Sequence, residues 1–276
     1  MFAERFKLHV MSETNHFSPL HAGHSIEQAV FVIQFASPVD DSVFADILGK
    51  TESFKDNLPG RRDLQQFLTL QQSSPPNAVA YAKYDSAGLI VNELQVHKNS
   101  IFFSTREYTR WTDVRNQAAY YFEQLLPIYI QHTKLNSVGL SYTDKFICEN
   151  ISSGFNPSSF LKENSKYIAP HVYDTDQLWH SHTGVFERVN NQTKRLININ
   201  LDYLDDRHEG NNRHSLVITS AINDQFYQPS YEALNIESDE TLGFVMSHME
   251  EIHTKNKEIL KHIINDDMSR RIALID

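Results

Sequence analysis

Residues 106–111 combine side chains that bind anions with a predicted change from strand to helix. The segment contains Arg106, Glu107, Tyr108, Arg110 and Trp111. Guanidinium groups offer forked donors that match phosphate and carboxylate oxygens, and the N–H groups at a helix start add to them. The segment therefore predicts an anion- or nucleotide-binding site. The structural alternative is an Arg–Glu pair, with the Trp as a hydrophobic staple that fixes the helix entry.

A second pattern has the spacing of metal ligands. His180 and His182 lie two residues apart in a predicted strand, so their side chains project from one face. Two imidazoles provide half of a zinc or manganese site, and Asp202, His208 or His214 could complete it from a neighbouring strand. A metal-dependent hydrolase or nuclease with ligands His180, His182, Asp202 and His214 is therefore one hypothesis. In the alternative, both imidazoles form hydrogen bonds across a polar sheet face.

Other spacings favour structural roles. His21 and His24 form an H-x-x-H pattern in a polar arm, which predicts a solvated turn. Glu250 and His253 form an E-x-x-H pattern on the last helix. The sequence lacks the second copy that a di-iron bundle needs, so a helix-surface contact is expected. The single cysteine, Cys148, has no adjacent His and predicts a buried, inert thiol.

Acid–base chemistry and calcium binding have weaker patterns. Asp144 and Lys145 lie in a predicted strand and could in principle transfer protons. Residues 205–212 are rich in oxygen ligands but lack the register of a calcium loop, so they predict a hairpin turn. The sequence contains no complete nucleophile, phosphate-loop or zinc motif. We therefore assign no catalytic residue and expect no cofactor.

Strand-rich blocks, each followed by a long helix, would position these residues. In the first block, a helix capped by Asp40 or Asp41 and ended by Pro59 follows the first strand. Thr112 caps a second helix, which Pro127 should kink or end. The predicted strands cover residues 29–35, 78–84, 89–97, 101–108 and 137–147, with a short strand or turn at 64–70 and a loop at 73–77.

The second block repeats this order. Its predicted strands are residues 178–189, 195–203 and 214–222. A helix over residues 239–264, capped by Ser238, follows them with apolar residues on one face. The sequence thus predicts an α+β fold of two related halves, each an antiparallel sheet packed against a long helix.

Four segments divide the chain in this interpretation. They are a polar N-terminal arm, a first α+β half, a connection and a second α+β half, which cover residues 1–24, 25–150, 151–177 and 178–276. The connection is rich in Ser, Asn and Pro, which is typical of a loop.

Composition narrows the partners and the compartment. The formal net charge of −10 repels phosphate, so a nucleic-acid partner is not expected. One cysteine excludes an intramolecular disulfide and suits a reducing cytoplasm. No apolar run reaches the ~18 residues of a membrane span. We expect a cytoplasmic protein that does not enter membranes.

Four motifs together resemble a sporadically distributed, largely uncharacterised family of bacterial proteins of similar length. They are IFFSTREYTRW at residues 101–111, VGLSYTDKF at 138–146, LWHSHTGVFE at 178–187 and MSRRIAL at 268–274. The resemblance covers the chain from about residue 25 onward and transfers no catalytic residue. The patchy distribution implies horizontal transfer, which suits anti-phage defence or toxin neutralisation.

These observations favour a non-catalytic interaction protein over an enzyme. The acidic balance would suit a basic protein partner through electrostatic complementarity. An exposed sheet edge in each half could also pair two copies into a homo-oligomer. The metal-dependent enzyme and the anion- or nucleotide-sensing module are the two alternatives.

Overall fold

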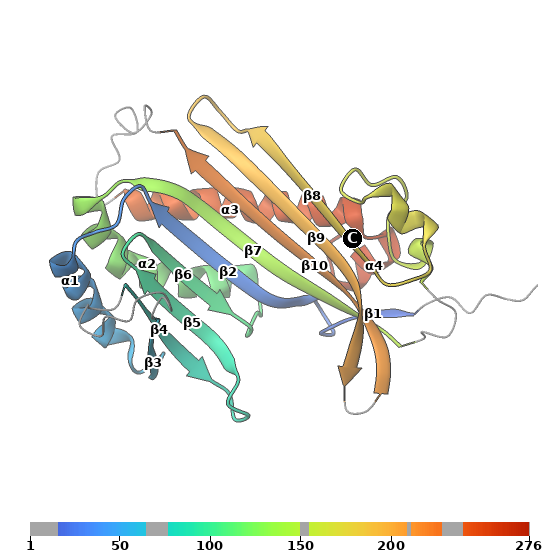
Figure 1. Cartoon of the computed structure of the whole chain (residues 1–276), viewed down its shortest axis with the longest axis horizontal. Coiled ribbons are helices and arrows are strands. Elements are labelled where there is room, and N and C mark those ends of the chain that lie inside the picture. Colours follow the sequence, from blue (N-terminus) through green and yellow to red (C-terminus); the bar gives the residue numbers. More distant parts are fainter. Residues whose placement is uncertain (1–15, 65–76, 150–154, 209–210, 228–239, 276) are drawn as a thin grey trace, which may run out of the picture.

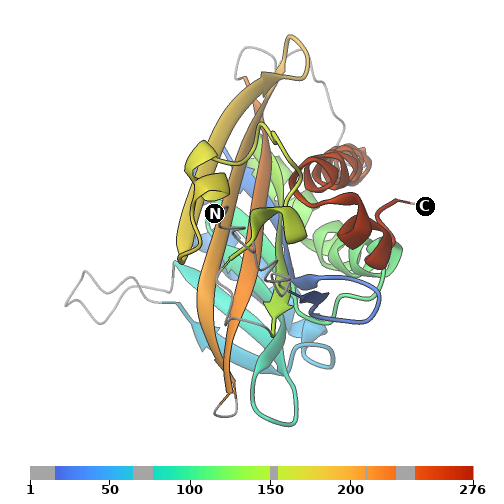
Figure 2. The ribbon, with the colours of Figure 1, turned by 90° about the vertical axis from the view of Figure 1, so that its right-hand side faces the viewer.

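One large antiparallel sheet dominates the protein. The computed structural model describes residues 16–64, 77–149, 155–208, 211–227 and 240–275. Figure 1 shows the sheet in front of the two long helices, and Figure 2 shows these helices together on one of its faces. The α+β class predicted from the sequence is therefore confirmed.

Ten strands form this sheet within the described residues. Their spatial order is β3-β4-β5-β6-β2-β7-β10-β9-β8, and the short β1 pairs with the end of β7. The strands are β1 Phe17–Pro19, β2 Ile26–Phe35, β3 Gly60–Asp63, β4 Ala78–Tyr84, β5 Ile90–His97, β6 Ser100–Thr105, β7 Leu135–Cys148, β8 Trp179–Arg188, β9 Thr193–His208 and β10 Asn211–Phe226.

Helices α2 and α3 cover one face of the sheet and contact each other. The α-helices are α1 Asp41–Thr51, α2 Trp111–His132, α3 Thr241–Ile263 and α4 Asp266–Arg271. Short 3₁₀ turns cover Glu52–Phe54, Pro157–Ser159 and Pro170–Asp174. No helix of the described residues is both long enough and apolar enough to cross a membrane.

The core lies between the helices and the sheet. Alternate residues of central strand β2 point toward the helices and are buried, as Phe31 and Phe35 illustrate. Phe35 stacks on Tyr129 of α2, with ring centroids 4.3 Å apart. The intervening β2 residues are only partly buried, because they face away from the helices. The alternation lies in the burial of β2 and not in its sequence, because residues 29–33 are all apolar.

Helix α2 begins differently from its prediction and does not end at Pro127. Arg110, not Thr112, is the N-cap residue, and the helix continues through Pro127 to His132. Proline removes one backbone hydrogen bond, but Leu126 and Tyr129 on either side are buried against the core. Packing of the apolar face therefore outweighs the local preference.

Part of the segment predicted to be a polar N-terminal arm forms a strand. Phe17 lies in β1, is 2% exposed and packs 4.9 Å from the ring of Phe160. Burial of one aromatic side chain thus fixes the chain beside β7. Residues 1–15 of the arm lie outside the described residues. The same holds for residues 73–76 of the loop predicted at 73–77, for most of segment 64–70 and for Ser238.

Strands β9 and β10 extend beyond their predicted ends into the segment expected to be a turn. The extension is held by charged side chains rather than by apolar alternation. Asp206 lies 3.2 Å from Arg213 on the paired strand and 3.2 Å from Lys145 on β7. Because this stabilisation is ionic, the hydrophobic pattern does not mark the strand ends.

Candidate functional site

A pocket of about 260 Å³ lies where the start of α2 meets β7, α3 and the chain after α4. Three of the four motifs quoted from the sequence contribute to its lining. Residues 101–111 supply Tyr108 and Arg110, residues 138–146 supply Asp144, and residues 268–274 supply Ile272 and Leu274. Segments far apart in the sequence therefore converge on one cavity.

A buried carboxyl group lies among the residues that line this pocket. Asp144 is 2% exposed and accepts a hydrogen bond of 2.7 Å from the Ser25 hydroxyl. Burial raises the pKa of Asp144 to about 6 and outweighs the lowering effect of that hydrogen bond. The group therefore exchanges its proton near neutral pH, which is uncommon for an aspartate.

A tyrosine–histidine pair forms the adjoining wall. The Tyr142 hydroxyl lies 2.8 Å from Nδ1 of His253. Burial, together with the positive charge of Lys257, lowers the pKa of His253 to about 4. His253 is therefore neutral at pH 7.

Trp111 joins α2 to both the sheet and α3. Its ring stacks on Phe31 with centroids 5.7 Å apart, and on His253 at 4.2 Å. Its indole N–H donates to Glu250 over 2.7 Å. Trp111 thus fixes the start of α2, as the structural alternative expected, although through α3. Glu250 and His253, for which the sequence predicts a helix-surface contact, both contact Trp111 and so join α3 to α2. His253 also lines the pocket.

Two cationic side chains line the pocket in addition to the Asp144 carboxyl group. They are Arg110 and Lys257, and within the described part of the chain neither forms an ion pair. Arg110 is also the N-cap of α2 and makes no side-chain capping bond, so the dipole of a 22-residue helix adds positive potential. His24 contributes a buried Nδ1 that has no hydrogen-bond partner.

The five residues predicted to bind an anion separate into two groups. Tyr108, Arg110 and Trp111 line the pocket. Arg106 is exposed outside it, and Glu107 lines a different cavity, where it pairs with Lys83 at 2.9 Å. The Arg–Glu pair of the structural alternative is therefore replaced by an ion pair between Glu107 and Lys83.

Several residues of the pocket belong to no motif that predicts a binding site. His24 was expected in a solvated turn, and Ser25 and Lys257 gave no signal. The Ser25–Asp144 hydrogen bond joins residues 119 apart in the sequence. Only the pairing of β2 with β7, which follows from the full topology, brings these residues together.

The residues predicted to bind a metal do not form one group. His180 and Asp202 lie 2.5 Å apart on the sheet face that points away from the helices, and His182 lies opposite Asn200. His214 points to the helical side, where Nδ1 lies 2.7 Å from the Tyr203 hydroxyl. The described residues do not include the side chain of His208. The two faces of the sheet separate the proposed ligands.

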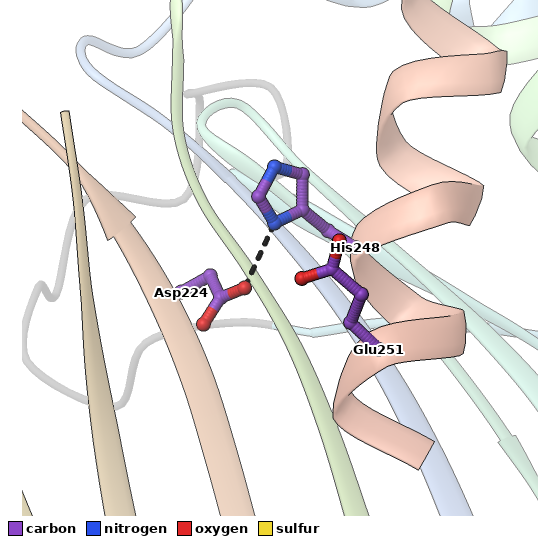
Figure 3. A group of neighbouring side chains, drawn as sticks. All are labelled: Asp224, His248 and Glu251. Carbon is purple, nitrogen blue, oxygen red and sulfur yellow. Dashed lines mark hydrogen bonds and ion pairs between the residues drawn. The ribbon is translucent and has the colours of Figure 1, made fainter. Parts of the chain in front are cut away.

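A different group has the spacing of metal ligands. Asp224 on β10 and His248 and Glu251 on α3 point toward one another (Figure 3), with ligand atoms within 4.8 Å. Arg195, however, donates to both Asp224 oxygens, over 2.6 and 2.8 Å, and His248 lies 2.8 Å from the second oxygen. The guanidinium already supplies the positive charge that a metal would bring.

This cluster is best described as a structural ion pair. Asp224 is fully buried, which raises its pKa, but the hydrogen bonds from Arg195 and His248 outweigh burial and hold the pKa of Asp224 below its usual range. Asp224 is therefore ionised at neutral pH. The cluster fastens α3 to β9 and β10.

No protein-family model and no curated protein matches this chain. The pocket's combination of unpaired cations, a helix N-terminus and buried polar atoms is suited to holding a small, negatively charged group.

Proposed function

We propose that this chain is a non-catalytic binding protein whose pocket at the start of α2 holds a small anion. The observation that carries the proposal is the pair of cations, Arg110 and Lys257, lining a cavity without carboxylate partners among the described residues. The volume of about 260 Å³ fits a phosphate or a small carboxylate rather than a large cofactor.

The polar groups of the pocket favour binding over catalysis. The Ser25 hydroxyl is held by a hydrogen bond of 2.7 Å to the buried Asp144 carboxyl group. Nδ1 of His253 is engaged by Tyr142, and the ring lies against Trp111. These contacts hold the side chains in place for recognition. Protonated Asp144 could donate a hydrogen bond to an anion's oxygen.

We expect orthophosphate or acetate to raise the melting temperature of the native protein. Arg110→Ala and Lys257→Ala should each remove most of this stabilisation, because each deletes a charge that lines the pocket. Loss of one charge-assisted hydrogen bond should weaken binding by about tenfold or more. Differential scanning fluorimetry over a ligand series measures the effect.

Arg106→Ala is the matched control for this test. Arg106 is an exposed arginine four residues before Arg110, and it does not line the pocket. Its loss changes the net charge equally and should leave the ligand-induced shift intact. Equal losses in the Arg106 and Arg110 variants would mean that the anions act through general electrostatics. The absence of any shift in the native protein would reject the proposal.

We also propose that the sheet arose by internal duplication. Support comes from the order of elements: β2 precedes the strands β4, β5 and β6 and then α2, and β7 precedes β8, β9 and β10 and then α3. Outward from the central pair β2 and β7, the sheet reads β6-β5-β4 on one side and β10-β9-β8 on the other. This arrangement would place the boundary between α2 and β7, rather than after residue 150.

The wider role that we propose is recognition within an anti-phage defence or toxin-neutralising module, with a basic protein partner. The acidic net charge of −10 supports this partner class. Native mass spectrometry of the chain purified from its own host should detect a stoichiometric protein partner. A chain that carries only a small anion would limit the function to the pocket, and a homo-oligomer would point to the sheet edges.

A further inference from the structure

We propose a second binding site, specific for a guanidinium group, in a cavity separate from the anion pocket. The cavity measures about 600 Å³ and is lined by residues from the segment after α1, from β4 and β5, and from α2. Its lining includes Asp56, Lys83, Asn92, Glu107 and Tyr120. None of these residues lines the anion pocket, so the two proposed sites can be tested independently.

Asn92 provides a buried acceptor that lacks a donor. The residue is 3% exposed, and its Nδ2 donates to Glu107 over 2.8 Å. This bond fixes the amide orientation, because the reverse orientation would place two acceptors together. Its Oδ1 is then buried without a hydrogen-bond partner. A buried unsatisfied acceptor is unfavourable, so a ligand N–H that reached it would be bound.

The charges of the cavity select a cation. Both Glu107 oxygens accept from Lys83, over 2.9 and 3.1 Å, so these two residues neutralise each other. Asp56, at an exposed position of the lining, forms no ion pair or hydrogen bond with the described residues. The cavity lining therefore retains one uncompensated negative charge in addition to the Asn92 acceptor.

An aromatic ring favours a planar cation over an ammonium group. Tyr120 is 41% exposed, and edge contacts to Tyr121 and Phe54, at 5.2 and 5.9 Å, hold its ring in place. A guanidinium can lie on an aromatic face while its N–H groups reach a carboxylate and an amide oxygen. The cavity can hold agmatine or one arginine side chain of a basic protein.

Isothermal titration with agmatine and with the blocked peptide acetyl-Gly-Arg-Gly-amide tests the site on the native protein. We expect binding of at least one probe, and weaker binding of butylamine. Asp56→Asn and Tyr120→Ala should each weaken binding by about tenfold or more, because each removes a direct contact. Both residues are exposed, so these variants should keep the fold.

Asp46→Asn is the matched control, because Asp46 is an exposed carboxylate on α1 outside the cavity. Asn92→Leu removes the buried acceptor and should also weaken binding if circular dichroism shows a native fold. Binding of agmatine identifies a free small molecule as ligand, and binding of the peptide alone identifies a partner's arginine. No binding of either probe, equal binding of butylamine, or unchanged affinity in the Asp56 and Tyr120 variants would overturn the site, whatever orthophosphate does.

Discussion

Replacing Asp224 with Asn is expected to lower the free energy of unfolding by about 3–5 kcal/mol. The native carboxylate accepts two hydrogen bonds from Arg195, over 2.6 and 2.8 Å, and one from His248. Asp224 is fully buried and Arg195 is 7% exposed, so the substitution would leave a buried guanidinium without its counterion. Urea unfolding followed by circular dichroism measures the change.

Glu251→Gln is the control for this variant. Its carboxylate lies 3.5 Å from the same guanidinium, but the side chain is 55% exposed. Solvent screens an exposed pair, so its loss should change stability by less than about 1 kcal/mol. The Asp224→Asn variant also tests whether the cluster of Asp224, His248 and Glu251, which has the spacing of metal ligands, binds a metal. Zinc should not stabilise the native protein, and marked stabilisation that Asp224→Asn abolishes would show that a metal displaces Arg195.

The sequence predicted most strands of both strand-rich blocks, because strands have recognisable apolar patterns. Their ends were less predictable where charged pairs hold the chain. The contacts of Asp206 with Arg213 and Lys145 extend β9 and β10 into a segment that reads as a turn. The charged residues there pair with one another across strands. Composition alone does not show this pairing, so it predicts a turn exposed to solvent.

Residue spacing along one strand predicted which side chains share a face of the sheet. It did not predict which residues lie opposite them on the neighbouring strand. His180 and His182 do share a face, as their separation of two residues requires. The register decides what lies opposite each, and it places Asp202 against His180 but Asn200 against His182. A shift of one residue would exchange the two faces, and no local pattern specifies it here.

The pocket was only partly predictable for a related reason. The sequence predicted Tyr108, Arg110 and Trp111 as site residues because they lie close together in the sequence at the start of a helix. Tyr142 and His253 lie 111 residues apart and meet only because α3 packs across β7. Side chains joined by tertiary packing carry no local signal, so the sequence located one wall of the site and missed the others.

Asp144→Asn is expected to raise the free energy of unfolding at pH 7 by up to about 3 kcal/mol. A pKa raised by burial to about 6 means that ionised Asp144 costs the folded state about this much relative to the unfolded chain. The asparagine keeps an oxygen that can accept from Ser25 and removes the buried charge. Urea unfolding at pH 7 measures the difference, and equal stability of the two proteins would mean that Asp144 ionises without penalty.

The pH dependence separates Asp144 from its neighbour His253. The folded protein binds the Asp144 proton more tightly than the unfolded chain, so acidification from about pH 6 to pH 4 stabilises it. Burial lowers the pKa of His253 to about 4, so the unfolded chain takes up that proton first. Acidification across the same range therefore destabilises the fold through His253, and the two effects oppose each other in the native protein.

In each single variant, the pH dependence of stability should show the contribution of the residue that is not replaced. Asp144→Asn should lose stability as pH falls from 6.5 to 4, and His253→Gln should gain stability over that range. Urea unfolding at half-unit pH steps measures both slopes, and parallel slopes in the two variants would contradict the opposition. An anion bound near Asp144 would favour its protonated form, so ligand should stabilise the native protein more at pH 5 than at pH 7. The same carboxyl group then links folding stability to occupation of the pocket.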